Sequence, residues 1–177
     1  TGDWTAIKNR SDDDRLVWAI GKVAAMFPDV EFIYRCHPTW IHPAHAGVNS
    51  INRCVEYISW LNLPNFKMSC NIPPAIQNGH FVLSYKRSSF EEDLKGVDLV
   101  LGEHSVAMLD AGFKGIPFAS CNMTCHRAFF KDINDLGFPH CETIEEIADL
   151  IRSLPSEKVK EQYRQAIVNY NKMTRIV

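Results

Sequence analysis

Residues 98–120, DLVLGEHSVAMLDAGFKGIPFAS, contain the side chains whose types and order point most directly to chemistry. An apolar run, a polar turn, an amphipathic segment and a second apolar run after Pro117 predict strand, turn, helix and strand, which is one βαβ unit. Ser105 then lies at a helix N-terminus, where unpaired N–H groups and the helix dipole favour an anion such as phosphate. Asp110, further along that helix, could reach a ribose hydroxyl. The segment therefore predicts a nucleotide site at the carboxyl edge of a parallel sheet.

A second polar turn follows the β-rich run 30–34 and reads Arg35-Cys36-His37-Pro38. His37 then lies at a sheet edge where open α/β folds bind ligands, and it can donate a hydrogen bond to a phosphate. Arg35, on the same face of a regular strand, offers a planar fork for the same group. Pro38 fixes the backbone beside this site. The alternative for His37 is a structural histidine in a loop.

The two motifs, in this order, resemble the donor-nucleotide region of GT-B glycosyltransferases. The downstream motif is Ser105, an acid and Ala at 110–111, three further residues, and Gly-x-Pro at 115–117. The upstream His-Pro pair is similar to one in bacterial capsule, teichoic-acid, Kdo and sialic-acid transferases, a group that includes CDP-glycerol glycerophosphotransferase-like enzymes. Asp110 stands where the family more often has Glu, which shortens its reach.

This resemblance implies a role for each residue of the two turns. His37 would be the catalytic residue because, with Arg35 and Ser105, it would offset the charge that grows on the departing phosphate. Glu103 and His104 would lie against the base or sugar. The general base is not visible here, since inverting GT-B enzymes take it from the N-terminal domain.

The resemblance also implies which ligands are used. The donor would be a nucleotide-activated sugar or polyol, CMP- or CDP-linked by preference and UDP-linked as the second choice. The acceptor would be a saccharide or a polyol phosphate. The acidic run 12–14 opens a helix, so no DxD-type acidic pair is expected to hold a divalent metal, in agreement with the metal-independent habit of the GT-B class, and no other cofactor is expected.

Length and composition set the fold expectation. A chain of 177 residues with 46% hydrophobic residues can bury one substantial core. We therefore expect a single domain over residues 1–177, an α/β, Rossmann-like, three-layer α/β/α fold with a mostly parallel sheet, equal to one half of a GT-B fold. The chain starts at Thr1 without a Met, so the missing N-terminal GT-B domain is expected upstream. The last helix, 156–172, could pack on that domain or cover the sheet.

Apolar periodicity and capping signals predict the individual elements. Helices are expected at 11–27, 48–61, 89–94, in the segment after Ser105, and at 129–136, 143–154 and 156–172. Strands are expected at 30–34, 65–68, 81–84, 99–101 and 117–120.

Charge and hydropathy limit the partners. A formal net charge of −2 gives no indication of a nucleic-acid partner, which would require a strongly basic face. No apolar run approaches the length that crosses a bilayer. The expected location is the cytoplasm, with any peripheral attachment to the inner face of the plasma membrane supplied by parts of a protein outside these residues.

The six cysteines are scattered singly, without a CxxC pair. In an α/β protein without a secretion signal they are expected to be reduced thiols, several of them buried. A zinc site is disfavoured because the spacing of the nearest candidates matches no standard finger or ribbon. Those candidates are Cys121, Cys125, His126, His140 and Cys141.

The function predicted from these observations is the donor-binding half of a glycosyl- or glycerophosphotransferase in surface-polysaccharide assembly, such as capsule synthesis. The isolated domain would be inactive alone. One alternative is a sugar-nucleotide 2-epimerase-like domain, which shares the fold and a similar Ser-then-acid motif. Another is a non-catalytic nucleotide-binding module. A receiver domain is disfavoured because its acidic cluster would have to lie at a strand, whereas residues 12–14 open a helix.

Overall fold

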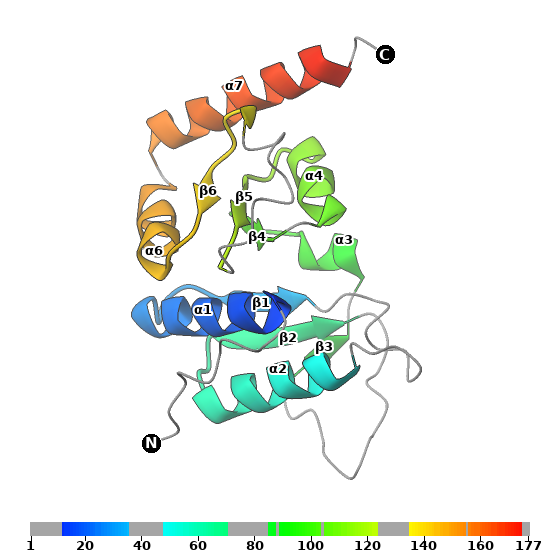
Figure 1. The fold of residues 1–177 in the computed structure, drawn as a ribbon, viewed down its shortest axis with the longest axis vertical. Coiled ribbons are helices and arrows are strands. Elements are labelled where there is room, and N and C mark those ends of the chain that lie inside the picture. Colours follow the sequence, from blue (N-terminus) through cyan, green and yellow to red (C-terminus); the bar gives the residue numbers. More distant parts are fainter. Residues whose placement is uncertain are drawn as a thin grey trace. The chain divides into compact units, whose positions relative to one another are not determined.

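A computed structural model of the chain shows two compact units, Thr1–Lys95 and Gly96–Val177. It describes residues 12–35, 48–70, 85–87, 89–103, 105–123, 135–154 and 156–174. Each unit has a three-stranded sheet in which the described strand pairs are all parallel, with helices packed on it (Figure 1). This confirms the α/β fold built on parallel strands and is compatible with a Rossmann-like arrangement. The assignment of residues 1–177 to a single domain stays a prediction.

The described elements of the first unit are α1 Asp12–Met26, β1 Phe32–Arg35, α2 Val48–Leu61, β2 Phe66–Cys70, β3 Tyr85–Arg87 and α3 Phe90–Asp93. The sheet order is β1-β2-β3, with Arg35 opposite Ser69 at the carboxyl ends of β1 and β2. The turn between α1 and β1 is held by Asn65, whose Nδ2 donates to the carbonyl oxygens of Ala24 and Phe27 at 3.0 and 2.9 Å.

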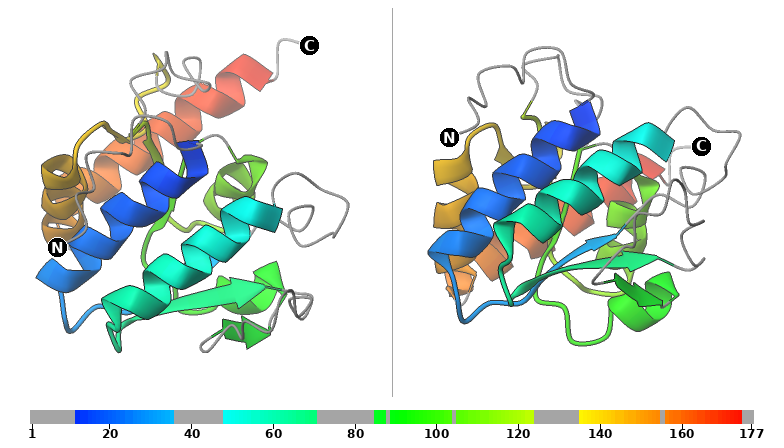
Figure 2. Two further views of the ribbon diagram at one scale, coloured as in Figure 1. Left: turned by 60° about the horizontal axis from the view of Figure 1, so that its bottom comes forward. Right: turned by 90° about the horizontal axis from the view of Figure 1, so that it is seen from below.

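Helices contact both faces of this sheet. Figure 2 shows α1 and α2 side by side, and α2 reaches the face that carries Tyr34, because the Cys54 thiol lies 3.9 Å from the Tyr34 hydroxyl. The next residue, Arg35, points to the opposite face, since side chains alternate along a strand. There it contacts Asp93 of α3. The carboxyl ends of β1 and β2 are thus fixed from both sides.

The contact between α1 and α2 depends on a glycine. A Cβ at Gly21 would lie only 2.5 Å from Leu61 Cδ1 and 2.8 Å from the Tyr57 hydroxyl. The Tyr57 hydroxyl donates to the Trp18 carbonyl oxygen at 3.2 Å, which joins the two helices. Burial raises the pKa of Tyr57 to about 12.

This pKa gives the first testable prediction, a loss of stability at alkaline pH through Tyr57. Because the folded-state pKa of about 12 exceeds the reference value of 10.0, the contribution is complete below about pH 10 and is lost as the pH rises towards 12. Tyr57→Phe should remove this loss while costing about 1 kcal/mol near neutral pH, because the hydrogen bond to Trp18 is gone. Urea unfolding of both proteins across this pH range is the measurement. Equal alkaline losses in the two would contradict the prediction.

The described elements of the second unit are β4 Val100–Gly102, α4 Val106–Phe113, β5 Phe118–Cys121, β6 His140–Cys141, α6 Ile144–Ser153 and α7 Glu157–Thr174. The sheet order is β4-β5-β6. In Figure 1, α4 lies beside β4 and β5, and α6 lies beside β6. Thr143 begins α6 with a capping box, as its sequence predicts, because its side chain accepts from the Glu146 N–H and the Glu146 side chain accepts from the Thr143 N–H.

A cluster of buried side chains joins α4, β5 and α7 in the second unit. The rings of Phe118 and Phe138 stack with their centroids 4.4 Å apart. The helices contribute Met108 from α4, and Tyr163 and Ala166 from α7. This cluster fixes α7 to its own unit. The further expectation that the last helix also packs on a missing domain stays a prediction.

Most predicted elements lie within two residues of the observed bounds, and three features differ. The strand β3 at Tyr85–Arg87 was not predicted, and the strand predicted at 81–84 lies outside the described residues. The short strand β6 had no counterpart in the sequence prediction, and the described strands form two sheets rather than one. The predicted helix 129–136 lies almost wholly outside the described residues. None of the helices in the described ranges is long and apolar enough to cross a bilayer.

Candidate functional site

The turn between β4 and α4 has the predicted strand–turn–helix form. Ser105 has extended backbone angles, φ −96° and ψ 131°, and its side chain accepts a hydrogen bond from the Ala107 N–H at 3.2 Å. It is therefore the N-cap of α4, at the carboxyl edge of a parallel sheet. Gly102 permits the tight turn, because a Cβ there would lie 2.8 Å from Met108 Sδ. Gly115, with φ +78°, provides the left-handed conformation just after α4 ends.

Two predicted ligands lie on either side of this N-cap. Glu103 follows β4 directly and is half-buried, whereas Asp110 is exposed on the second turn of α4. With about 100° per residue, Asp110 lies roughly 140° around the helix from Ser105. A ligand that contacts both residues must therefore extend from the helix N-terminus along its side. A nucleotide, with a phosphate at one end and a ribose beyond it, has such a shape.

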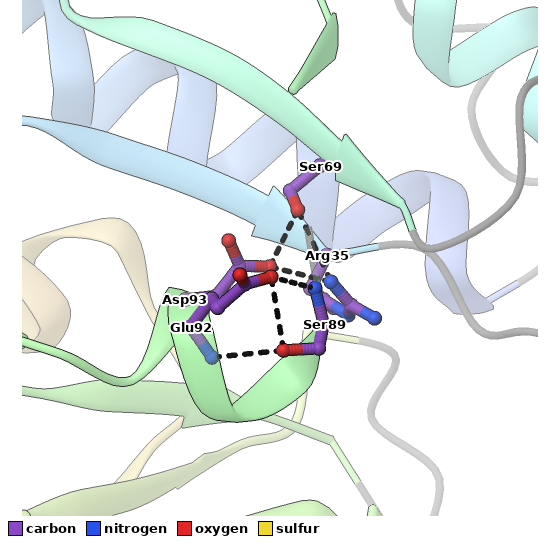
Figure 3. A network of polar contacts seen from close by, with 5 residues as sticks. All are labelled: Arg35, Ser69, Ser89, Glu92 and Asp93. Carbon is purple, nitrogen blue, oxygen red and sulfur yellow. Dashed lines mark hydrogen bonds and ion pairs between the residues drawn. The ribbon is translucent and has the colours of Figure 1, made fainter. Parts of the chain in front are cut away.

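Arg35 takes part in a polar network at the carboxyl ends of β1 and β2 (Figure 3). Its Nη1 lies 2.6 Å from Asp93 Oδ2 and donates to Ser69 Oγ at 3.2 Å. The Ser69 hydroxyl in turn donates to Asp93 Oδ2 at 2.5 Å. Ser69 and Asp93 are buried, with 0% and 8% of their surfaces exposed, and 19% of the Arg35 side chain is exposed. Arg35 is thus paired with the Asp93 carboxylate, which neutralises the positive charge that would attract a phosphate. Its predicted phosphate contact stays a prediction.

The short helix α3 presents Asp93 to this network. Ser89 caps the helix: its side chain accepts from the Glu92 N–H at 3.2 Å, and Glu92 Oε2 accepts from the Ser89 N–H at 2.7 Å. The sequence predicts the helix but not the partner of Asp93. No sequence signal marks Asp93, because Glu91 and Glu92 beside it on the same helix are exposed acids.

Three predicted site residues, His37, Pro38 and His104, lie outside the described residues. Of the others, Arg35 belongs to the first unit, while Glu103, Ser105 and Asp110 belong to the second. Within the second unit the structure brings Glu103 and Ser105 to the same turn. The roles predicted for all seven residues stay predictions.

A polar chain at β5 and β6 was not found by sequence reasoning. Ser120 lies opposite His140 in the parallel pair, and its Oγ is 2.9 Å from His140 Nδ1. His140 Nε2 lies 3.1 Å from Glu142 Oε1. If the Nε2–H donates to this carboxylate, Nδ1 accepts from the Ser120 hydroxyl. Ser120 is buried, and this chain of contacts connects β5 with β6.

Three of the described cysteines are buried and form no disulfide: Cys54, Cys121 and Cys141. No group of three or more His, Cys, Asp or Glu side chains in the described ranges is arranged to hold a metal ion. Cys125 and His126 lie outside those ranges.

Comparisons with protein-family models, with curated proteins and with solved structures found no match. The resemblance to GT-B glycosyltransferases therefore stays a prediction from the two sequence motifs.

Proposed function

We propose that this chain is the donor-nucleotide-binding half of a GT-B glycosyl- or glycerophosphotransferase of surface-polysaccharide assembly. The observation that carries the proposal is Ser105, which caps α4 directly after a parallel strand and is exposed to solvent. Strand ends of this kind are where open α/β sheets bind ligands, and the N–H groups of the first helical turn bind phosphate. The order of the two motifs supports the same proposal.

In this proposal each side chain stabilises one part of the donor. Ser105 and the first N–H groups of α4 hold the phosphate, and their positive ends oppose the negative charge that grows on it as the bond to the transferred group breaks. Asp110 accepts from a ribose hydroxyl, and Glu103 contacts the base or sugar. His37, which lies outside the described residues, keeps its sequence-predicted role as a donor to a phosphate.

The acceptor and the general base of the reaction come from outside this chain. The acceptor is a saccharide or polyol phosphate, and its general base comes from an N-terminal GT-B domain. A cytidine-linked donor is the preferred substrate. An enzyme that helps to assemble a surface polymer would act in the cytoplasm, at the inner face of the plasma membrane. Other parts of the protein would attach it there.

Calorimetric titration with CMP, CDP, UMP, UDP and ADP tests the proposal. We expect cytidine nucleotides to bind, and Ser105→Ala to weaken binding about tenfold, because a hydrogen bond to a charged group contributes about 1.5 kcal/mol or more. The matched control is Ser156→Ala. Ser156 is also an exposed serine whose side chain accepts from a backbone N–H at the start of a helix, α7, but it follows no strand. Equal losses in the two variants, or no binding of any nucleotide, would contradict the proposal.

Asp110→Asn tests the ribose contact separately. We expect it to weaken CMP binding but to leave the binding of 2′,3′-dideoxy-CMP unchanged, since that ligand has already lost the hydroxyls. In the wild type the dideoxy ligand should bind several-fold more weakly than CMP, by about 1 kcal/mol for one hydrogen bond. A similar effect of Asp110→Asn on both ligands would show that Asp110 acts other than through the ribose.

A further inference from the structure

Two buried cysteines lie directly opposite each other in neighbouring strands of the second unit. Cys121 ends β5 and Cys141 ends β6, and the parallel register pairs these two residues. Their exposed fractions are 0% and 2%, and both thiols are free. Residues paired across neighbouring strands have Cα atoms about 4.8 Å apart. This separation falls inside the range of about 4.4–6.8 Å that disulfides span.

The two thiols also contact each other. The Cys121 S–H donates to the Ala119 carbonyl oxygen at 4.0 Å. The interaction between the two thiols lowers the pKa of the Cys141 thiol and, together with burial, raises the pKa of the Cys121 thiol. Two carboxylates act against ionisation of the thiols. Glu103, which follows β4, raises the pKa of Cys121, and Glu146 of α6 raises the pKa of Cys141. Tyr163 of α7 is the remaining titratable neighbour. Cys141 is thus the better nucleophile, and Cys121 is in place to react with it.

We propose that Cys121 and Cys141 form a redox-active dithiol that a peroxide converts to a disulfide between β5 and β6. The Cys141 thiolate attacks one peroxide oxygen, the O–O bond breaks, and hydroxide leaves, so that Cys141 becomes a sulfenic acid. The Cys121 sulfur then attacks Cys141 Sγ and the S–O bond breaks. The hydroxyl leaves as water with the Cys121 proton, and the hydroxide takes up the proton released when Cys141 ionised. In sum, two thiols and one hydrogen peroxide give one disulfide and two waters.

The dithiol lies next to the end of β4, which leads into the turn that holds Ser105. The backbone of Gly102, the last residue of β4, acts to lower the pKa of the Cys121 thiol, against the larger effects that raise it. The strand end from which the Ser105 turn departs is therefore in contact with the reacting pair. The inference does not depend on the proposed function, because its readout is a covalent bond.

Peptide mapping after exposure of the full chain to hydrogen peroxide tests the inference. We expect a peptide pair linked through Cys121 and Cys141, with a mass about 2 Da below the sum of the reduced peptides, and recovery of both thiols with dithiothreitol. In Cys121→Ser the link should be absent, and Cys141 should instead gain about 16 or 32 Da as the sulfenic or sulfinic acid. Cys54→Ser is the control, since Cys54 is also a buried thiol but lies in the first unit, where it contacts the Tyr34 hydroxyl at 3.9 Å.

Two results would overturn the inference. One is that both thiols remain open to alkylation after denaturation at peroxide concentrations that oxidise the other cysteines of the chain. The other is a disulfide from either residue to a different cysteine in place of the expected link. The mapping of the wild-type chain decides between these outcomes even if a serine variant fails to fold.

Discussion

Asp93→Ala is expected to lower the free energy of unfolding by about 3 kcal/mol. The change leaves the Arg35 guanidinium without its carboxylate partner at 2.6 Å, and it leaves the buried Ser69 hydroxyl without its acceptor. Removing one member of a buried ion pair costs about 3–5 kcal/mol, because the remaining charge is uncompensated. We place the value at the low end since 19% of the Arg35 side chain is exposed and water can solvate part of it. Urea unfolding near neutral pH measures the difference.

The same sheet offers a matched control. Glu31 and Lys67 also form an ion pair, at 3.3 Å, but both side chains are about half-exposed. Glu31→Ala should therefore cost less than about 1 kcal/mol. The double variant Arg35→Met with Asp93→Ala should recover part of the stability lost in Asp93→Ala alone, since it no longer buries an unpaired charge. Equal losses for Asp93→Ala and Glu31→Ala, or no recovery in the double variant, would contradict the structural role of Arg35.

The features that sequence reasoning predicted well are local ones. α2 was predicted with the observed bounds because its apolar residues recur at helical spacing. The capping residues Ser105 and Thr143 were identified because a short polar side chain before a helix satisfies N–H groups only two or three residues away. For the same reason the turn that holds Ser105, the centre of the candidate site, could be placed from sequence alone.

The features that were missed depend on contacts between distant residues. Arg35 and Asp93 are 58 positions apart, and no spacing rule connects them. The strand β6 has only two residues, His140 and Cys141, too few for any periodicity to show. Its pairing with β5 creates both the link between Ser120 and His140 and the thiol pair. The residue types can be read from the sequence, but the neighbour of each one is set by the sheet register.

A second large effect is expected for Phe118→Ala, about 3–5 kcal/mol lost from the free energy of unfolding. The Phe118 ring is 1% exposed, stacks on Phe138, and lies under α4 so closely that a Cβ at Gly112 would be 2.8 Å from its Cε1. Alanine would leave a cavity between α4 and β5 that the neighbouring backbone cannot fill. Phe118→Leu, which keeps most of the volume, should cost about 1.5 kcal/mol or less.

Phe113→Ala is the control for this change, because Phe113 has the same side chain, lies on the adjacent helix α4 and is 67% exposed. The Phe113 ring makes an edge contact with Tyr170, at 5.7 Å between ring centroids, so its removal should lower the free energy of unfolding by no more than about 1 kcal/mol. Urea unfolding compares the two, and a loss for Phe113→Ala as large as that for Phe118→Ala would contradict the core assigned to the second unit.

The same variants also bear on the candidate site. Phe118 does not touch the proposed nucleotide, so its variant should lower the fraction of protein that binds CMP but not the affinity of the folded fraction. Ser105→Ala should do the reverse, and this difference separates a residue that holds the fold from one that holds the ligand.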